Sequence, residues 1–394
     1  MAGCWADAET TPKRRTKKAA AFMAKVCYVA AAMIQHLYAH IPFCPKVCPY
    51  CSFFKEASDR NKTRAFLDAM LMEAEKHAPG LRPVTVFFGG GTPTAVSTSQ
   101  LEYLIGGLRD RIDFSAVEEF TMEMNPATVS LEKARRMRDL GVNRVSMGVQ
   151  SWDPELLKTL GRVHSAEQAE RSYEILREAG FDNLNLDLMF GVPGQTREQW
   201  RHSLEKNIAL GPEHISAYCL TYEEDTEYFL RLNRGIYQPD AELDADLFEM
   251  TMEILEGAGY AQYEISNYAK PGRECRHNLA YWLGADYVGL GPSAFSTAGG
   301  LRWKNISNTE DYVVRVNEGR DTFDFSEPVD PATRRAEQVA FGLRTNRGVA
   351  RELLAAEKTS EFEKLGFLRQ EGSSWFLTRK GRMLADELAE TLME

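Results

Sequence analysis

The sequence predicts an α/β fold, a partial (β/α)6 TIM-type barrel followed by a small C-terminal α+β module of winged-helix type. From Leu37 onward, short β-rich apolar runs alternate with longer helical patterns, which is typical of a parallel sheet built from β/α units. Six such units occur and no return partner follows them, so we expect an open barrel. The chain has 394 residues and 44% hydrophobic content, enough to bury a large core in one large domain and a smaller one.

The six units can be placed by their apolar patterns. We expect strands at Leu37–Ile41, Val84–Phe88, Glu119–Met124, Arg144–Gln150, Asn183–Phe190 and His214–Tyr222. We expect helices between them at Lys62–His77, Ser99–Arg109, Leu131–Leu140, Ala166–Ala179 and Arg197–Leu210. Barrels of this type carry their sites on loops at the carboxyl ends of the strands, so polar residues there are candidates.

The rest of the chain departs from this pattern. A long acidic helix is predicted over Asp240–Gly257, and the tail carries two or three helices and two short strands that meet at Glu371–Gly372. We therefore expect a barrel core at 33–235, an extension at 236–330 and the C-terminal module at 331–394. Winged modules often bind DNA, but a net charge of -10 gives a nucleic-acid partner no bulk electrostatic support. We favour a packing or lid role for the module.

Residues 1–32 differ from the remainder because they hold six Lys or Arg and only two acids. Their apolar stretch is interrupted by Lys25 and is too short to span a bilayer. A signal or transit peptide is one interpretation. We favour a disordered extension or an upstream start codon, with Met33 opening the fold. Seven cysteines, three of them in one motif, fit a reducing compartment, and we expect a cytoplasmic protein.

The segment YAHIPFCPKVCPYCSFFK holds Cys44, Cys48 and Cys51 in a C-x3-C-x2-C spacing. Thiolates are the soft ligands that iron–sulfur clusters require, and the prolines within the run favour a loop. Three ligands would leave one iron of a [4Fe-4S] cluster open to bind the amino and carboxylate groups of S-adenosylmethionine (SAM). A zinc site with His40 as fourth ligand and a chance cluster are the alternatives.

Polar residues follow the next strands at their carboxyl ends. The run FFGGGTPT lets the backbone approach a ligand without a side chain in between. Glu123, Gln150 and Asp187 stand at or near the ends of later strands, where a buried acid is costly unless it meets a polar partner. For Asp187 we expect that partner to be Arg162 or a ligand hydroxyl. Each could alone be a satisfied structural group, but a shared rim favours a shared ligand.

In order, the motifs YAHIPFC, CPYC, GGGTPT, GVQSW, LGR and DLMFGVPGQT resemble the HemN/HemW family of radical SAM proteins over nearly all of residues 33–394. The resemblance implies cluster ligands at Cys44, Cys48 and Cys51. It implies SAM contacts at Tyr38, Gly91, Glu123 and Ala217. Contacts to a second SAM, described in the oxidase branch, fall on Tyr50, Thr92, Gln150, Arg162 and Asp187.

Two positions bear on the branch of the family. The oxidase branch has a fourth cysteine two residues after the cluster motif, where this chain has Phe53. The segment HNLAYW, which begins at His277, resembles the H-N-x-x-Y-W motif of HemW-type haem chaperones, and a neutral imidazole can ligate haem iron. The alternative for His277 is a loop histidine that caps a turn made by Pro271 and Gly272. Cys275 is either a second ligand or a buried small residue.

These residues support three hypotheses. The leading one is a protein that binds haem and delivers it to an acceptor haem protein, such as a respiratory, membrane-associated one, with cluster and SAM serving assembly, homodimer formation or triggered transfer. The second is an enzyme, the oxygen-independent coproporphyrinogen III oxidase (dehydrogenase), which yields protoporphyrinogen IX. The third is another radical SAM reaction on a tetrapyrrole, such as haem ring opening. Phe53 argues against the second, and the intact SAM positions argue against a purely structural role.

Overall fold

The computed structural model describes residues 33–393 except 58–59 and 127. The predictions made for residues 1–32 lie outside the described residues. Among the described helices, none combines the length and apolar character that crossing a lipid bilayer requires.

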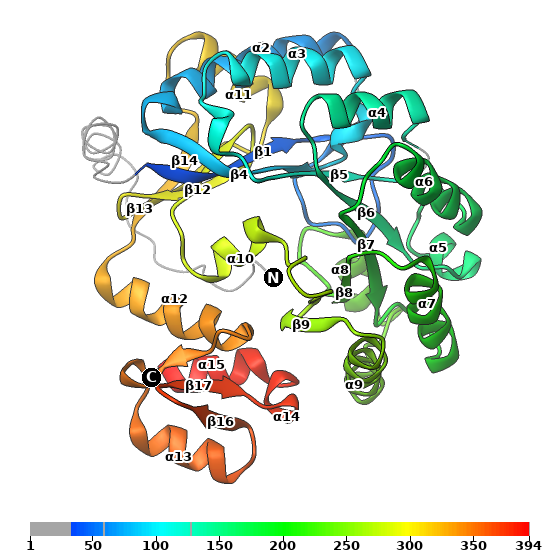
Figure 1. Ribbon diagram of the computed structural model, residues 1–394, viewed down its shortest axis with the longest axis vertical. Coiled ribbons are helices and arrows are strands. Elements are labelled where there is room, and N and C mark those ends of the chain that lie inside the picture. The colour runs from blue at the N-terminus through cyan, green and yellow to red at the C-terminus, as the bar shows by residue number, and fades with distance from the viewer. Residues whose placement is uncertain (1–32, 58–59, 127, 394) are drawn as a thin grey trace.

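A nine-stranded sheet in the order β11-β1-β4-β5-β6-β7-β8-β10-β9 forms the centre of the molecule (Figure 1). The six predicted strands are present, run parallel and lie in chain order. They are β1 (Ile34–Ile41), β4 (Leu81–Gly90), β5 (Glu119–Met124), β6 (Arg144–Gln150), β7 (Leu184–Phe190) and β8 (His214–Cys219). The sixth therefore ends three residues before the predicted Tyr222.

The sheet continues beyond the six units at both edges, which the sequence did not predict. At one edge β11 (Val288–Leu290) adds parallel to β1. At the other, β10 (Asn267–Ala269) and β9 (Ala261–Glu264) add antiparallel. All three strands come from the extension after residue 235, so this part of the chain completes the barrel sheet.

Helices cover the outer face of the sheet (Figure 1). Three of the predicted helices begin at a capping box, in which a Ser or Thr and a Gln three residues later each bond the other's backbone N–H. The outer helices are α2 (Arg60–His77), α3 (Thr98–Arg109), α4 (Leu131–Asp139), α5 (Pro154–Thr159), α6 (Ala166–Glu178), α7 (Arg197–Leu210) and α9 (Ala241–Gly257). The short helix α8 (Glu227–Asn233) instead lies beside the cysteine-bearing loop after β1, since Tyr228 N donates to Pro49 O. Short 3-10 turns lie at η1 (Ala78–Gly80), η2 (Pro93–Ala95), η3 (Phe114–Ala116) and η4 (Arg351–Leu353).

Strand alternation separates the two faces of the sheet. In β1, Leu37, Ala39 and Ile41 are fully buried in the core against the helices. The alternate residues His36, Tyr38 and His40 point to the inner face, where His36 and Tyr38 are partly exposed and His40 is buried. The inner face is therefore where polar chemistry can occur.

The extension also holds α10 (Arg276–Trp282), a small antiparallel sheet of β12 (Phe295–Ala298), β13 (Leu301–Asn305) and β14 (Phe323–Pro328), and α11 (Thr309–Asn317). The fully buried carboxylate of Glu73 on α2 joins these parts. It accepts hydrogen bonds from Gly291 N at 2.8 Å, Asn305 Nδ2 at 2.7 Å and the Tyr312 hydroxyl at 2.6 Å. Burial raises the pKa of Glu73.

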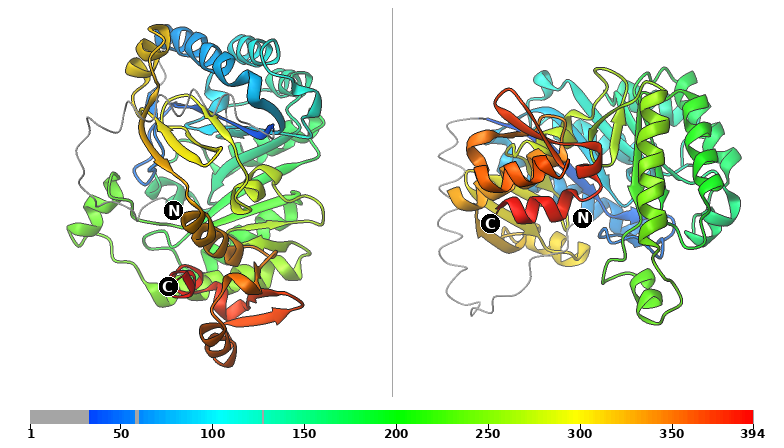
Figure 2. Two further views of the ribbon diagram at one scale, coloured as in Figure 1. Left: turned by 90° about the vertical axis from the view of Figure 1, so that its left-hand side faces the viewer. Right: turned by 90° about the horizontal axis from the view of Figure 1, so that it is seen from below.

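The C-terminal segment lies at one end of the molecule (Figure 2). It comprises α12 (Pro331–Arg344), β15 (Val349–Ala350), α13 (Ala356–Lys364), β16 (Leu368–Glu371), β17 (Ser374–Leu377), α14 (Arg379–Arg382) and α15 (Ala385–Met393). The strands pair in the order β15-β17-β16. A second hydrophobic cluster, which includes Leu343, Trp375 and Leu388, lies beneath them. The strand pair that the sequence predicts around Glu371–Gly372 is β16 and β17.

Candidate cluster and cofactor site

The cysteine loop, residues 42–57, leaves the carboxyl end of β1 and is closed by the short parallel pair β2 (Phe43–Cys44) and β3 (Glu56–Ala57). Its three cysteines carry free thiols: Cys44 is buried, and Cys48 and Cys51 are half-buried. Burial raises the pKa of the Cys44 and Cys51 thiols, the neighbouring thiols add to this, and the cation of Lys55 opposes it. The three thiols are thus near enough to influence one another.

The thiols fit an iron–sulfur cluster in number and chemistry, since three soft donors lie on one loop without a disulfide. In the described part of the chain, no three His, Cys, Asp or Glu side chains converge into a set that could hold a metal ion. The loop as folded therefore brings the thiols near one another without closing them into a ligand set.

His40, the fourth ligand that a zinc site would need, is engaged elsewhere. Its Nδ1 lies 3.0 Å from the Tyr38 hydroxyl and its Nε2 lies 2.8 Å from the backbone oxygen of Phe54. Burial lowers the pKa of His40 to about 4, so the ring is neutral. Because both ring nitrogens of His40 already have partners, His40 is not available as the fourth ligand of a zinc site.

A chain of polar contacts connects the cysteine loop to the ends of three strands. Asn125, just after β5, donates from Nδ2 to the Thr92 hydroxyl at 2.8 Å, and that hydroxyl lies 3.5 Å from the Cys44 sulfur. Arg162 donates to Asn125 Oδ1 at 2.6 Å and reaches the Cys48 sulfur at 3.6 Å. Thr92 and Arg162, both predicted, therefore meet through Asn125, which the sequence analysis missed although it stands in the MEMNP run at a strand end.

The predicted acids lie on the inner face beside this chain. Glu123 accepts a hydrogen bond from Gly90 N at 3.2 Å, and burial, reinforced by the charge of Asp187, raises its pKa to about 8. Asp187 accepts from Asn185 Nδ2 at 2.7 Å and from the Ser146 hydroxyl at 3.3 Å. Of the two partners expected for Asp187, Arg162 is the wrong one, because Arg162 donates to Asn125 and Gly148 and reaches Cys48; a ligand hydroxyl stays a prediction.

The glycine run has a more local role than the sequence predicts. A Cβ on Gly91 would lie 2.6 Å from the backbone oxygen of Pro42, so its absence lets the cysteine loop cross the end of β4. Gly90 adopts a φ of +106°, and a Cβ there would meet the ring of His40 at 2.7 Å. The close neighbours of these two glycines are therefore residues of the protein itself, Pro42 and His40.

Three further candidates are Gln150, Tyr50 and Ala217, of which the first two lie beside Arg162. Gln150 ends β6 with a φ of 68°, a left-handed backbone that is strained for a residue other than glycine. The side chain of Tyr50 packs with its ring centroid 6.1 Å from that of Tyr228 on α8. Ala217 is buried on β8 next to the end of that strand. The Gln150 and Arg162 side chains both approach the position where a Cβ of Gly148 would stand, and the Tyr50 hydroxyl interacts with both Arg162 and Cys48.

His277 is not on a loop, and it does not cap the turn at Pro271 and Gly272. It lies in the first turn of α10 with no exposed surface. Its Nδ1 is 2.7 Å from the Thr85 hydroxyl, and its Nε2 is 2.8 Å from the Tyr281 hydroxyl. Burial lowers the pKa of His277 to about 3, so the ring is neutral.

Glu119 at the start of β5 anchors this helix. Its carboxylate accepts from Arg276 N at 2.9 Å and from His277 N at 3.1 Å, and the Cys275 thiol lies 3.5 Å away. A carboxylate at a helix N-terminus satisfies backbone donors that would otherwise be unpaired. Cys275 is fully buried within this arrangement.

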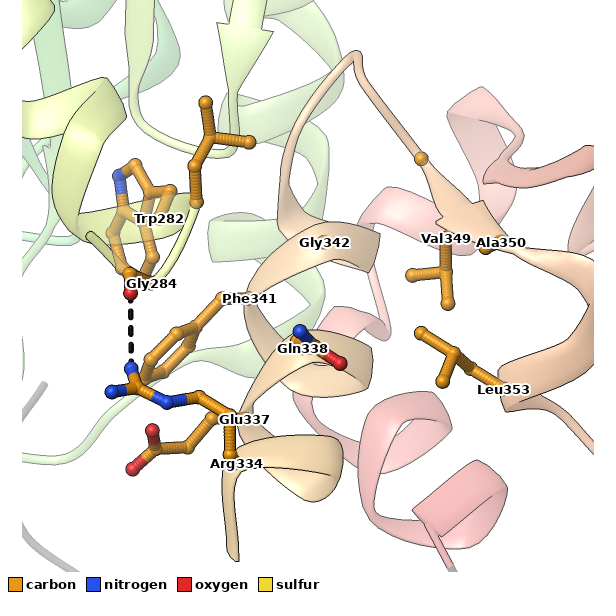
Figure 3. Close-up of a pocket in the computed structure, with 12 residues that line it drawn as sticks. Trp282, Gly284, Arg334, Glu337, Gln338, Phe341, Gly342, Val349, Ala350 and Leu353 are labelled. Atoms are coloured by element: carbon orange, nitrogen blue, oxygen red, sulfur yellow. Dashed lines mark hydrogen bonds between the residues drawn. The ribbon is translucent and has the colours of Figure 1, made fainter. Parts of the chain in front are cut away.

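The last residue of HNLAYW points away from the barrel. Trp282 borders a hollow of about 200 Å³ between α10 and α12 (Figure 3). Its ring lies 5.7 Å from that of Phe341, and the guanidinium of Arg344 lies 4.9 Å from the Trp282 centroid. Arg334 donates to Gly284 O at 2.9 Å. The motif therefore ends at the junction with the C-terminal segment.

A parallel α/β sheet with a three-cysteine loop after its first strand defines the class of radical SAM proteins, and the model of the Radical SAM superfamily matches residues 38–206. Proteins of this class carry a [4Fe-4S] cluster and SAM. The solved coproporphyrinogen III oxidase (HemN) of Escherichia coli superposes with a TM-score of 0.82 at 24% identity, covering 94% of this chain and 92% of that one. This likeness shows the shared fold.

Curated relatives define the family more narrowly. The Heme chaperone HemW of Bacillus subtilis (strain 168) is 35% identical over 369 residues, covering 89% of this chain and 97% of that protein. The Heme chaperone HemW of Mycobacterium tuberculosis (strain ATCC 25618 / H37Rv) is 33% identical, with 91% and 94% covered. That of Escherichia coli (strain K12) is 40% identical, with 66% and 68% covered. This chain belongs to the HemW family.

Proposed function

We propose that this protein is a haem chaperone, which binds haem and delivers it to acceptor haem proteins. The observation that carries the proposal is its alignment with the Heme chaperone HemW of Bacillus subtilis over 97% of that protein's length. The HNLAYW segment and Phe53 support it. Phe53 stands where the oxidase branch has its fourth cysteine, and with 67% of its side chain exposed it offers no ligand.

We further propose that Cys44, Cys48 and Cys51 would hold a [4Fe-4S] cluster, which would leave one iron open to SAM and, when reduced, could supply the electron for SAM cleavage. The chain of Thr92, Asn125 and Arg162 would hold the cysteine loop against the strand ends, because its members bond one another and reach two of the cysteine sulfurs.

The proposed SAM contacts are Tyr38 and Glu123 on the inner face, Gly91 just beyond the end of β4, and Ala217, whose side chain packs in the hydrophobic core on the other face of the sheet, so that only its backbone could contribute. Glu123 is suited to an ammonium or a ribose hydroxyl, because its carboxyl group is buried and takes only one backbone hydrogen bond in the described structure. Gly91 would contribute backbone atoms only. The positions tied to a second SAM are Tyr50, Thr92, Gln150, Arg162 and Asp187.

The alternative is an enzyme, oxygen-independent coproporphyrinogen III oxidase. The intact contacts of Thr92 and Arg162 favour some chemistry on SAM, whichever tetrapyrrole is bound. Phe53 weighs against the decarboxylation itself. We propose the segment 331–394 as a separate module with a packing or lid role, since it has its own hydrophobic cluster and meets the barrel extension at Trp282.

The proposal is tested by anaerobic titration of the cluster-reconstituted protein with haem, followed by mixing the loaded protein with membranes that contain apo-forms of a respiratory haem protein. A haem chaperone should bind haem in saturable, stoichiometric amounts and transfer it faster than the same concentration of free haem. No saturable binding would contradict the proposal. Conversion of coproporphyrinogen III under reducing conditions with SAM would support the enzyme instead.

A further inference from the structure

We infer that the HNLAYW segment presents the phenol of Tyr281, and not the imidazole of His277, to haem iron, and that His277 is a positioning residue for that phenol. The inference deepens the proposed function and rests on it. It concerns which side chain of the segment meets the bound tetrapyrrole.

His277 is enclosed on every side. Both ring nitrogens have partners, Thr85 at 2.7 Å and Tyr281 at 2.8 Å, and the backbone N–H is held by Glu119 at 3.1 Å. The ring stacks on Phe87 at a centroid distance of 5.2 Å. Iron coordination would require one of these nitrogens to lose its hydrogen bond and α10 to move away from Glu119, which would leave buried polar groups unpaired.

Tyr281 lies one helical turn further along, and its side chain keeps some exposed surface. Burial raises the pKa of its phenol well above the usual value, so ferric iron would have to displace the phenol proton to solvent as the iron–oxygen bond forms. Residues four apart in a helix share one face, which is why its hydroxyl reaches His277 Nε2. Tyrosine is an established axial ligand of haem iron. An imidazole bonded to the phenol oxygen fixes its direction, as the orienting partners of metal ligands generally do.

The surroundings of Tyr281 suit a porphyrin face. Its ring lies 4.4 Å from that of Tyr287. The rings of Tyr38 and Phe87 are stacked at 6.2 Å on the neighbouring strands, and Phe87 in turn contacts His277. These aromatic side chains lie along the inner face of β1 and β4, next to the proposed SAM contact Tyr38. Trp282, by contrast, lies in the separate hollow of Figure 3 and is not part of this group.

The test compares ferric haem titrations of the wild type with Tyr281→Phe, Tyr287→Phe and His277→Gln, followed by absorption and resonance Raman spectroscopy. Tyr287→Phe is the matched control, because it removes the same hydroxyl from the adjacent ring. The wild type should show an iron–phenolate charge-transfer signature. Tyr281→Phe should lose that signature and weaken haem binding ~10-fold or more, the scale of one strong contact. Tyr287→Phe should keep both.

His277→Gln should keep the phenolate signature, shifted in frequency, because a glutamine can still contact the phenol. Thermal unfolding of each variant checks that the fold persists. A wild-type spectrum with imidazole ligation that His277→Gln abolishes and Tyr281→Phe preserves would overturn the inference while leaving the proposed function intact. A wild type that binds no haem would contradict the proposed function itself, and with it the inference.

Discussion

The cysteine loop and helix α10 each carry a family motif, and the two regions are held in opposite ways. In the loop, Cys48 and Cys51 are half-buried, and Val47 and Phe53 are exposed to solvent by 46% and 67%. In α10, His277 and the neighbouring Cys275 are fully buried, and Glu119 anchors the helix N-terminus. The cysteine sulfurs of the loop are therefore available to a cofactor. In α10, by contrast, most polar groups are already hydrogen-bonded within the protein.

From this contrast we expect the largest effect of any substitution to come from replacing a cysteine of the loop, and the effect should be on cluster binding. Cys48→Ala should abolish the cluster, seen as loss of protein-bound iron and sulfide after reconstitution, because a three-thiolate site has no spare ligand. Haem affinity of the monomer should remain if the two sites are separate. Cys219→Ala, an exposed cysteine outside the loop, is the control and should keep its iron. Equal loss of haem and iron in Cys48→Ala would contradict the two-site arrangement.

A substitution under α10 should act on stability instead. Glu119→Ala removes the acceptor of the Arg276 and His277 backbone N–H groups, and we expect a loss of about 3 kcal/mol in the free energy of unfolding, measured by denaturant titration. Glu118→Ala is the matched control, because its ion pair with Arg276 is 59% exposed on both sides and should contribute under about 1 kcal/mol. Similar effects of both substitutions would show that α10 is not anchored by Glu119.

Asn125 allows a finer test of the loop. Asn125→Ala removes one hydrogen-bond partner from the Thr92 hydroxyl and one from an Arg162 nitrogen. The free energy of unfolding should therefore fall by about 1–2 kcal/mol. SAM affinity, measured by calorimetry on the reconstituted protein, should fall because the strand ends are no longer tied to the cysteine loop. Unchanged SAM affinity would limit Asn125 to a structural role.

A separate test concerns the pH dependence of stability. The pKa of Glu123 is raised from 4.5 to about 8, so the folded protein binds more protons than the unfolded chain between these values. Stability from this group is therefore present at low pH and is lost as the pH rises from 4.5 to about 8. Glu123→Gln should flatten that slope in melting curves of the cofactor-free protein. A wild type and variant with parallel pH profiles would show that Glu123 titrates normally.

Much of the barrel could be predicted because its signals are local. Apolar alternation and Ser or Thr caps lie within each segment, and the resulting helix and strand bounds agree within a few residues. The edge strand β11 could not be predicted in the same way, since three residues, Val288–Leu290, carry too little pattern to indicate a partner more than 200 positions earlier. Arg162 was wrongly expected as one possible partner of Asp187 for a similar reason, because its long side chain could reach several acceptors and only the fold selects Asn125.

By itself, the sequence determined the cysteine spacing, the absence of a fourth cysteine at Phe53, the order of β/α units and the presence of HNLAYW. Only the tertiary structure decided which atoms of these motifs remain available. His277 became a buried side chain because Thr85 and Glu119, 192 and 158 residues away in the chain, supply its partners. Buried polar groups must be paired, and the pairing of residues so far apart is settled by the packing of the whole sheet.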